Sequence, residues 1–304
     1  MLLRFTKMHG LGNDFVVLDL ISQNVHLRPE QIRELADRRT GIGFDQLLTV
    51  GPPTNPDLDF YYRIYNADGS EAEQCGNGAR CVLRFVRDRG LTTRTRARFQ
   101  TRNGCMEASL EKDGTVTVDM GAPRLLPNQV PFVADAPQIT YDIAVDGCVA
   151  VTSPIRSMTS QPTAACNATQ ASTCTTTHHV SAISIGNPHA VLLVEDVERA
   201  PVQTLGPLIE SHPRFPERTN VGFMEIIDRG HVRLRVFERG VGETLACGSG
   251  ACAAAVSGRL RGLLDEEVEV ELPGGSLTIG WAGDDAHISM RGPVSRVYEG
   301  RLQI

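Results

Sequence analysis

Two cysteines of this chain lie in almost the same local sequence. Cys75 lies in EAEQCGNGARC and Cys247 in ETLACGSGAC, and each precedes a Gly-x-Gly-Ala stretch that opens an apolar helical pattern. The N-terminus of a helix carries about half a positive charge, which lowers the pKa of a nearby thiol. Two such thiols suit a reaction in which one removes a proton from one face of a carbon and the other delivers a proton to the opposite face. The pattern therefore indicates inversion of a stereocentre.

The residues that follow each cysteine are suited to holding a carboxylate. Glycine lets backbone amides approach a ligand closely, and the first amides of a helix have no partner within the helix. We therefore expect Gly76 and Asn77, together with Gly248 and Ser249, to hold the α-carboxylate of an amino acid. Four other cysteines are interpreted as small buried hydrophobes: Cys81, Cys105, Cys148 and Cys252.

The two cysteine segments belong to a longer internal repeat. Aligned without gaps, Arg63 to Ala79 matches Arg235 to Ala251, with identity at the arginines, the cysteines and the residues listed next. The identical pairs are Arg63/Arg235, Glu71/Glu243, Cys75/Cys247, Gly76/Gly248, Gly78/Gly250 and Ala79/Ala251. GNDFVVLD and IGFDQLL recur in order as GNPHAVLLV and VGFMEII. The repeat predicts two duplicated lobes related by a pseudo-twofold axis, each presenting one cysteine to a shared cleft.

The composition restricts the class of protein. A chain of 304 residues suits two domains, and its net charge of −6 without a long basic run argues against nucleic acid as a partner. No apolar stretch approaches the length of a membrane helix, and the N-terminus does not resemble a signal peptide, so we expect no membrane association and a cytoplasmic protein with reduced thiols. Only Lys7 and Lys112 are lysines, and neither lies in the repeated motifs, which argues against a pyridoxal-phosphate Schiff base. We expect no cofactor and no metal.

The local patterns predict an α+β fold. Residues 2–20 read as two strands around a Gly-rich turn, 28–41 as a helix, and 99–121 as strands joined at Asn-Gly and Asp-Gly turns. Few helices and many short strands predict lobes that are each a curved or barrel-like, mostly antiparallel sheet around a central helix, the helix after each cysteine. The expected N-terminal lobe is 1–121 plus about 292–304, and the C-terminal lobe is 122–291.

The Ser/Thr-rich segment at about 152–179 differs from the rest of the chain. Large apolar residues are nearly absent from it, which is typical of a surface insertion or mobile loop. It contains Cys166, Cys174, His178 and His179, but their spacing matches no common zinc site. We expect an exposed loop without a metal.

Several motifs together resemble the diaminopimelate epimerase family: MHGLGNDFVVLD, GIGFDQLL, YNADGSEAEQCGNGARC, GNPHAV, TNVGF, ERGVGETLACGSGACA and PGGSL. The resemblance runs almost end to end, except for the Ser/Thr-rich segment. It implies two similar lobes that close on the substrate and a cofactor-independent interconversion of LL- and meso-diaminopimelate, for lysine and peptidoglycan synthesis. It further implies that RVYEGRLQI returns to the first lobe and that Tyr298 is a dimer contact, so we expect a homodimer.

The resemblance also assigns roles to individual residues. Cys75 and Cys247 are then the acid–base pair, and His189 and Glu238 tune these thiols, Glu238 also lying at the substrate. The residues implied to hold the amino groups and the distal carboxylate of the substrate are Asn13, Gln46, Asn66, Asn187, Asn220 and Arg239. An arginine suits a far carboxylate because its planar guanidinium binds both oxygens.

Other functions remain as alternatives. Proline racemases and hydroxyproline epimerases also use paired cysteines, but their substrates have no second amino-acid end for the asparagines and Arg239 to hold. Phenazine-type isomerases have a similar fold without the cysteine pair. A non-catalytic metal-binding or redox protein is disfavoured because the chain has no Cys-x-x-Cys.

Overall fold

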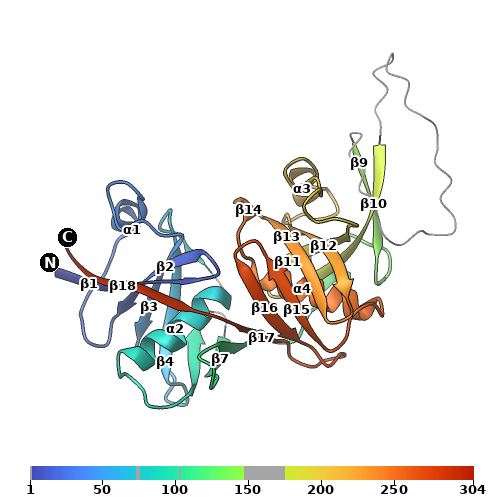
Figure 1. The fold of residues 1–304 in the computed structure, drawn as a ribbon. Helices are drawn as coiled ribbons and strands as arrows, with labels where there is room; N and C mark the ends of the chain where they lie inside the picture. Colours follow the sequence, from blue (N-terminus) through green and yellow to red (C-terminus); the bar gives the residue numbers. More distant parts are fainter. Residues whose placement is uncertain (1, 73–75, 103, 147–174) are drawn as a thin grey trace. The chain divides into compact units, whose positions relative to one another are not determined.

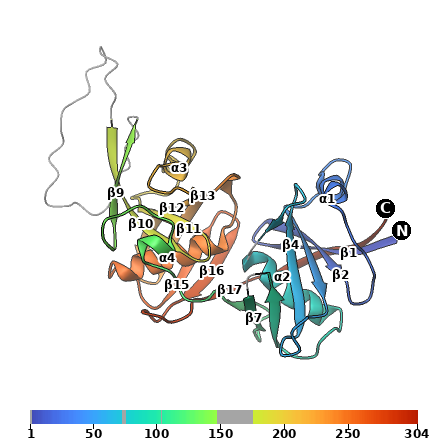
Figure 2. The same ribbon diagram turned by 180° about the vertical axis from the view of Figure 1, so that it is seen from behind.

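The computed structural model describes residues 2–72, 76–102, 104–146 and 175–304. These residues form four α-helices and eighteen strands, in agreement with the predicted sheet-rich α+β class. Chain contacts divide them into two compact units (Figures 1 and 2). The first unit comprises Met1–Ala122, Leu245–Ser249 and Gly274–Ile304, and the second comprises Pro123–Thr244 and Gly250–Pro273.

The first unit begins with the two strands and the helix that the sequence predicts. Its elements are β1 (Leu2–Gly10), β2 (Asn13–Asp19), α1 (Pro29–Ala36), β3 (Gln46–Gly51), β4 (Phe60–Asn66), β5 (Glu71–Ala72), α2 (Gly76–Asp88), β6 (Arg96–Thr101), β7 (Gly104–Leu110) and β8 (Val116–Asp119). Pro29 starts α1, and Ile32, Leu35 and Ala36 form its buried face. Helix α2 packs against β1, β7 and β8, and most of its residues are buried, as expected for a central helix.

The second unit repeats this order of elements. It contains the 3-10 turn Pro127–Gln129, β9 (Tyr141–Asp146), β10 (Thr175–Ser184), β11 (Pro188–Leu193), α3 (Val202–Glu210), β12 (Asn220–Asp228), β13 (His231–Glu238), β14 (Gly242–Thr244), most of α4 (Gly248–Leu260) and β15 (Glu267–Leu272). Helix α4 is buried from Gly250 to Ser257, and Ser257 Oγ donates a hydrogen bond of 2.8 Å to Ser181 Oγ on β10.

The chain then returns to the first unit through β16 (Gly275–Gly280), β17 (Ser289–Gly292) and β18 (Ser295–Gln303). Strand β17 pairs antiparallel with β8, and β18 pairs antiparallel with β1. The expected return of RVYEGRLQI to the N-terminal lobe thus corresponds to the β1–β18 pairing.

Strand pairing confirms the internal duplication. In each copy a hairpin is followed by a parallel neighbour, which pairs antiparallel with the next strand: β1–β2–β3–β4 in the first and β10–β11–β12–β13 in the second. The short strands β5 and β14 occupy equivalent places, and β4–β6 and β13–β15 are equivalent parallel pairs. Strand β9 pairs with β10 as β18 pairs with β1.

The structure differs from the expected lobe boundaries in three places. The return to the first unit begins at Gly274 rather than near 292, and Leu245–Ser249, which contains Cys247, groups with the first unit rather than the second. The expected loop up to residue 179 ends earlier, because Thr175 begins β10 and pairs with Asp146. His178 is buried in this strand, so it is not part of an exposed loop. Residues 147–174 of the insertion, with Cys148, Cys166 and Cys174, lie outside the described residues.

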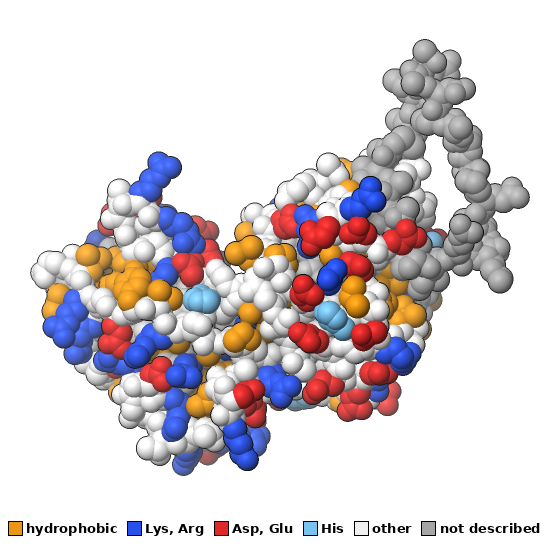
Figure 3. Space-filling model, in the orientation of Figure 1, with side chains coloured by type: hydrophobic (Ala, Val, Ile, Leu, Met, Phe, Trp, Pro, Cys, Tyr) orange, Lys and Arg blue, Asp and Glu red, His pale blue; other side chains and the backbone are white. Residues whose placement is uncertain are grey.

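The surface carries charges of both signs. On the face drawn in Figure 3, carboxylates and cations are interspersed on both units. None of the helices among the described residues is long and apolar enough to cross a membrane.

Candidate active site

The segment that leads into α4 carries the one predicted acid–base cysteine that the structure describes. Cys247 is a free thiol, is 4% exposed and lies directly before Gly248, the first residue of α4. Its Sγ lies 3.7 Å from Ser249 Oγ. Cys75 lies outside the described residues, directly before Gly76, the first residue of α2. A thiol at the start of a helix is in the field that favours its thiolate form.

Asn77 connects the starts of both helices within the first unit. Its Nδ2 donates to the carbonyl oxygen of Ala246 at 3.2 Å and to Asn13 Oδ1 at 3.4 Å. Its Oδ1 is buried and has no hydrogen-bond partner among the described residues. A Cβ built on Gly248 would lie 3.3 Å from this oxygen. A buried acceptor without a partner costs free energy, and it is available to a donor such as a substrate ammonium.

A buried methionine lies against the first residue of each helix. A Cβ on Gly76 would lie 2.6 Å from Met290 Cε, and a Cβ on Gly248 would lie 2.9 Å from Met290 Sδ. The fully buried Arg80 of α2 places Nη1 3.7 Å from the same sulfur and donates through Nε to the carbonyl oxygen of Pro293. Both glycines are therefore needed for packing as well as for access to their amides. Sequence reasoning missed Met290 because it lies about 200 residues from Arg80 along the chain and in no repeated motif.

Three predicted substrate residues lie at strand ends in the first unit. Asn13 begins β2, Gln46 begins β3 and Asn66 ends β4. Gln46 Nε2 donates to Asn66 Oδ1 at 2.9 Å, and Asn13 Nδ2 donates to Asp45 Oδ2 at 3.0 Å. The structure thus brings Gln46 beside Asn66, and Asn13 beside Asn77.

Charged residues that the sequence reasoning did not single out support these side chains. Arg38 bonds both Asp14 and Asp45 at 2.7 Å, and Lys7 Nζ bonds Asp14 at 2.5 Å and the carbonyl oxygen of Gly43. Burial opposes ionisation of Asp14, but hydrogen bonds from Arg38 and Lys7 hold its pKa well below the usual range. The GIGFDQ motif, with Asp45 directly before Gln46, was the signal that would have found this network.

The predicted residues of the second unit form a second group. Asn187 precedes β11, His189 lies on it, and Asn220 begins the parallel neighbour β12. His189 pairs with Asn220 in this register, and its Nε2 lies 3.1 Å from Asn187 Oδ1. Asn220 Oδ1 accepts from the backbone N–H of Arg239 at 2.8 Å, while the exposed guanidinium of Arg239 donates to the carbonyl oxygen of Glu217.

The two groups occupy equivalent positions of the duplicated fold. Asn13 and Asn187 are each 174 residues apart in the chain, as are Gln46 and Asn220, and both pairs lie at the starts of equivalent strands. Glu238 ends β13 as Asn66 ends β4, and its Oε1 accepts a hydrogen bond from Thr244 Oγ1.

His189 is a neutral imidazole at neutral pH. It is 1% exposed, and burial lowers its pKa from 6.5 to about 3, with a smaller contribution from the positive charge of Arg239. His189 therefore acts in this unit as a hydrogen-bonding group rather than as a cation.

Glu210 at the end of α3 is a supporting residue that the sequence gave no reason to select. It is 4% exposed, and its Oε1 accepts from the backbone N–H of Gly240 at 2.7 Å, directly after Arg239. Its other oxygen pairs with Arg218 at 2.9 Å, and its carbonyl oxygen accepts from Thr219. Glu210 thus holds the two turns on which Asn220 and Arg239 lie.

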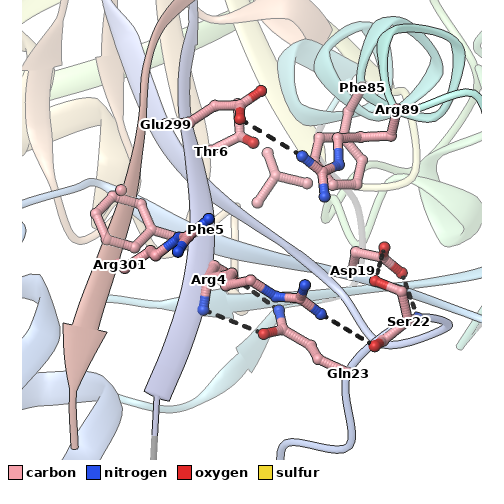
Figure 4. A pocket seen from close by; sticks show the side chains of 12 residues that line it. Arg4, Phe5, Thr6, Asp19, Ser22, Gln23, Phe85, Arg89, Glu299 and Arg301 are labelled. Carbon is pink, nitrogen blue, oxygen red and sulfur yellow. Dashed lines mark hydrogen bonds and ion pairs between the residues drawn. The ribbon is translucent and has the colours of Figure 1, made fainter.

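A separate cavity of about 350 Å³ lies in the first unit, away from these groups (Figure 4). Its lining includes Arg4, Asp19, Arg89, Glu299 and Arg301, and it contains none of the predicted catalytic or substrate-binding residues. Among the residues that the structure describes, no cluster of three or more His, Cys, Asp or Glu side chains is placed to hold a metal ion.

Comparisons with known proteins agree on one family. The family model described as diaminopimelate epimerase matches residues 5–126 and 181–297. The chain is 54% identical over 304 residues to a diaminopimelate epimerase from Azotobacter vinelandii and 53% identical to one from Ectopseudomonas mendocina, with 100% of each chain covered.

Solved structures share the fold at low sequence identity. A hydroxyproline epimerase from Agrobacterium vitis matches with a TM-score of 0.64 at 15% identity, covering 99% of this chain and 92% of the other. A phenazine biosynthesis protein from Bacillus anthracis matches with a TM-score of 0.64 at 14% identity, covering 100% of both chains. These matches bear out the two-lobe epimerase fold class.

Proposed function

The chain belongs to the diaminopimelate epimerase family, and on this premise we propose how its own residues interconvert LL- and meso-diaminopimelate. The protein is an isomerase. In the proposed reaction one thiolate removes the α-proton, and the thiol of the other cysteine delivers a proton to the opposite face of the same carbon. Cys75 and Cys247 exchange these roles when the direction of the reaction is reversed.

The observation that carries this proposal is the start of α4. Cys247 is buried directly before the helix, and Asn77 from the start of α2 bonds the carbonyl oxygen of the preceding Ala246. The two helix starts therefore meet in the first unit, where unpaired amides and helix dipoles favour negative charge. Such a field stabilises both a thiolate and the charge that develops at the α-carbon and carboxylate, in a reaction that uses no carbonyl cofactor as electron sink.

The substrate contacts follow from the two groups of polar side chains. We assign the α-carboxylate to the amides of Gly76, Asn77, Gly248 and Ser249, and the buried Oδ1 of Asn77 to a substrate donor. The remaining ligands are assigned to the amino groups and the distal carboxylate: Asn13, Gln46, Asn66, Asn187, Asn220, Glu238 and Arg239. The guanidinium of Arg239 is exposed and suits the distal carboxylate. His189 and Glu238 tune the thiols, His189 in its neutral form.

The test uses single cysteine variants in deuterated water. Cys75→Ala and Cys247→Ala should each lose epimerisation of LL-diaminopimelate, because each face of the carbon needs its own proton carrier. The wild-type protein should incorporate deuterium at the inverted α-carbon only. Cys252→Ala is the matched control, since this cysteine lies on the same helix α4 and is fully buried. Full turnover by either Cys75→Ala or Cys247→Ala would refute the two-thiol mechanism, and equally fast racemisation of proline would refute the substrate.

We also propose a cytoplasmic homodimer. The thiols at the two helix starts must stay reduced to exchange protons, which suits the cytoplasm. Strand β18 presents Val297 and Tyr298, 56% and 45% exposed, and the Tyr298 ring lies edge-on to Phe5 at 5.9 Å. Exposed apolar side chains on a terminal strand of nine residues support a contact with a second copy.

A further inference from the structure

Two ion pairs occupy equivalent places in the duplicated fold. In the first unit, Arg63 on β4 binds Glu71 on β5 through Nε and Nη2, both at 2.8 Å. In the second unit, Arg235 on β13 binds Glu243 on β14 through Nε at 2.6 Å. These four residues account for two of the six positions that are identical in the gap-free repeat around the cysteines. The other four are the two cysteine positions and the small residues after them.

Each pair connects a long strand to the short strand that leads into a cysteine. Glu71 lies opposite Tyr65, and Glu243 lies opposite Phe237, in matching antiparallel registers. Along the chain, each glutamate lies four residues before its cysteine. The Arg63 guanidinium also lies 5.2 Å from the centre of the Tyr65 ring.

The short strands need a side-chain anchor. Strand β5 has two residues and β14 has three, so each forms few backbone hydrogen bonds with its neighbour. Both glutamates are about four-fifths buried, and both oxygens of Glu243 are engaged because Gln203 donates to Oε2 at 2.6 Å. Hydrogen bonds from Arg63 and Arg235 lower the pKa of Glu71 and Glu243, so both stay ionised at neutral pH.

We propose that the Arg63–Glu71 and Arg235–Glu243 pairs are duplicated positioning residues, each of which sets the geometry and reactivity of the cysteine four residues after its glutamate. This inference rests on the proposed function only in taking the two thiols as the reacting groups. Neither pair contacts the reacting carbon; each acts through its short strand. A sequence that has diverged elsewhere retains the two pairs because both thiols must be held at the same standard.

The test measures the reactivity of each thiol separately. Glu71→Gln and Glu243→Gln remove one charge at nearly constant shape, and the rate of iodoacetamide alkylation at Cys75 and Cys247 is followed by peptide mapping. In Glu243→Gln, alkylation of the buried Cys247 should become about fivefold faster, the factor that corresponds to about 1 kcal/mol for a part-exposed ion pair. In Glu71→Gln, the rate at Cys75 should change by a similar factor, and in each variant the other thiol should change less.

Two matched controls lie in the same chain. Asp88→Asn removes the Arg84–Asp88 pair on α2, and Asp265→Asn removes the Arg229–Asp265 pair in the second unit. Both controls should leave the two alkylation rates within about twofold of the wild type, as is usual for exposed pairs. Equal changes at both thiols, or none, in Glu71→Gln and Glu243→Gln would overturn the inference.

The alkylation readout does not depend on turnover. Failure of the proposed mechanism appears as full epimerisation by Cys75→Ala or Cys247→Ala. Failure of the positioning inference appears as unchanged alkylation in the two glutamate variants, so the two outcomes are distinguishable.

Discussion

Acidification should destabilise the second unit through the buried imidazole of His189. The folded protein holds this side chain neutral, with its pKa lowered by burial from 6.5 to about 3, whereas the unfolded chain binds a proton near pH 6.5. The matched substitution is His189→Phe. Phe15 is the equivalent residue of the first unit, 174 residues earlier, and is itself fully buried on β2.

The sign and the size follow from proton linkage. Below pH 6.5 the unfolded state binds one proton that the folded state does not, so the free energy of unfolding falls as pH falls. The slope is about 1.36 kcal/mol per pH unit, which amounts to about 2 kcal/mol between pH 6.5 and pH 5. The loss ends near the folded pKa of about 3, and above pH 6.5 the imidazole contributes no pH dependence.

The measurement is urea unfolding of wild type and His189→Phe at pH 7, 6 and 5. The other titrating groups contribute equally to both proteins, so the difference between the two curves reports His189. We expect this difference to shift by about 2 kcal/mol in favour of the variant between pH 7 and pH 5. Parallel curves would refute the reasoning, as would an imidazole NMR signal of His189 that titrates near pH 6.5 in the folded protein.

Three further predictions follow from the site. Gly248→Ala should lower the free energy of unfolding by about 1–3 kcal/mol, because its Cβ would lie 2.9 Å from buried Met290 Sδ; in urea unfolding, Gly51→Ala, with only Leu20 at 3.8 Å, should stay near wild type. Arg239→Lys should lower kcat/KM for diaminopimelate by about tenfold or more, because an ammonium cannot bind both oxygens of the distal carboxylate, whereas Arg233→Lys on the same strand should not. Tyr298→Glu should convert the dimer to a monomer in light scattering, and a monomeric wild type would contradict the proposed contact.

Local patterns were sufficient for much of the fold. The helix at Pro29–Ala36 was predictable because its proline start and apolar spacing act within ten residues. The strands around Leu11 and Gly12 were predictable because both residues adopt positive φ there, which suits a tight turn before alternating apolar residues. The duplication was predictable because the same short motifs recur in the same order, and β1–β4 and β10–β13 pair accordingly.

The predictions were less accurate where distant segments meet. The return to the first unit was placed near residue 292, although β16 and β17 also belong there, because the β8–β17 pairing joins residues about 170 apart and leaves no local pattern. The end of the Ser/Thr-rich segment was wrong for the same reason. Thr175 and His178 look like loop residues by composition, but pairing with β9 makes them part of a strand.

The sequence by itself determined the chemistry that this protein has available: two cysteines, each directly before a glycine that begins a helix, and an ionised Arg–Glu pair repeated before each of them. Residue type and spacing suffice for this, because a helix start and a hairpin are set by a few neighbouring residues. Only the tertiary structure decided that Cys247 packs with the first unit, that Met290 and Arg80 lie against both helix starts, and that His189 is neutral. These properties depend on burial and on contacts between residues about 200 positions apart, and neither is encoded in any local segment.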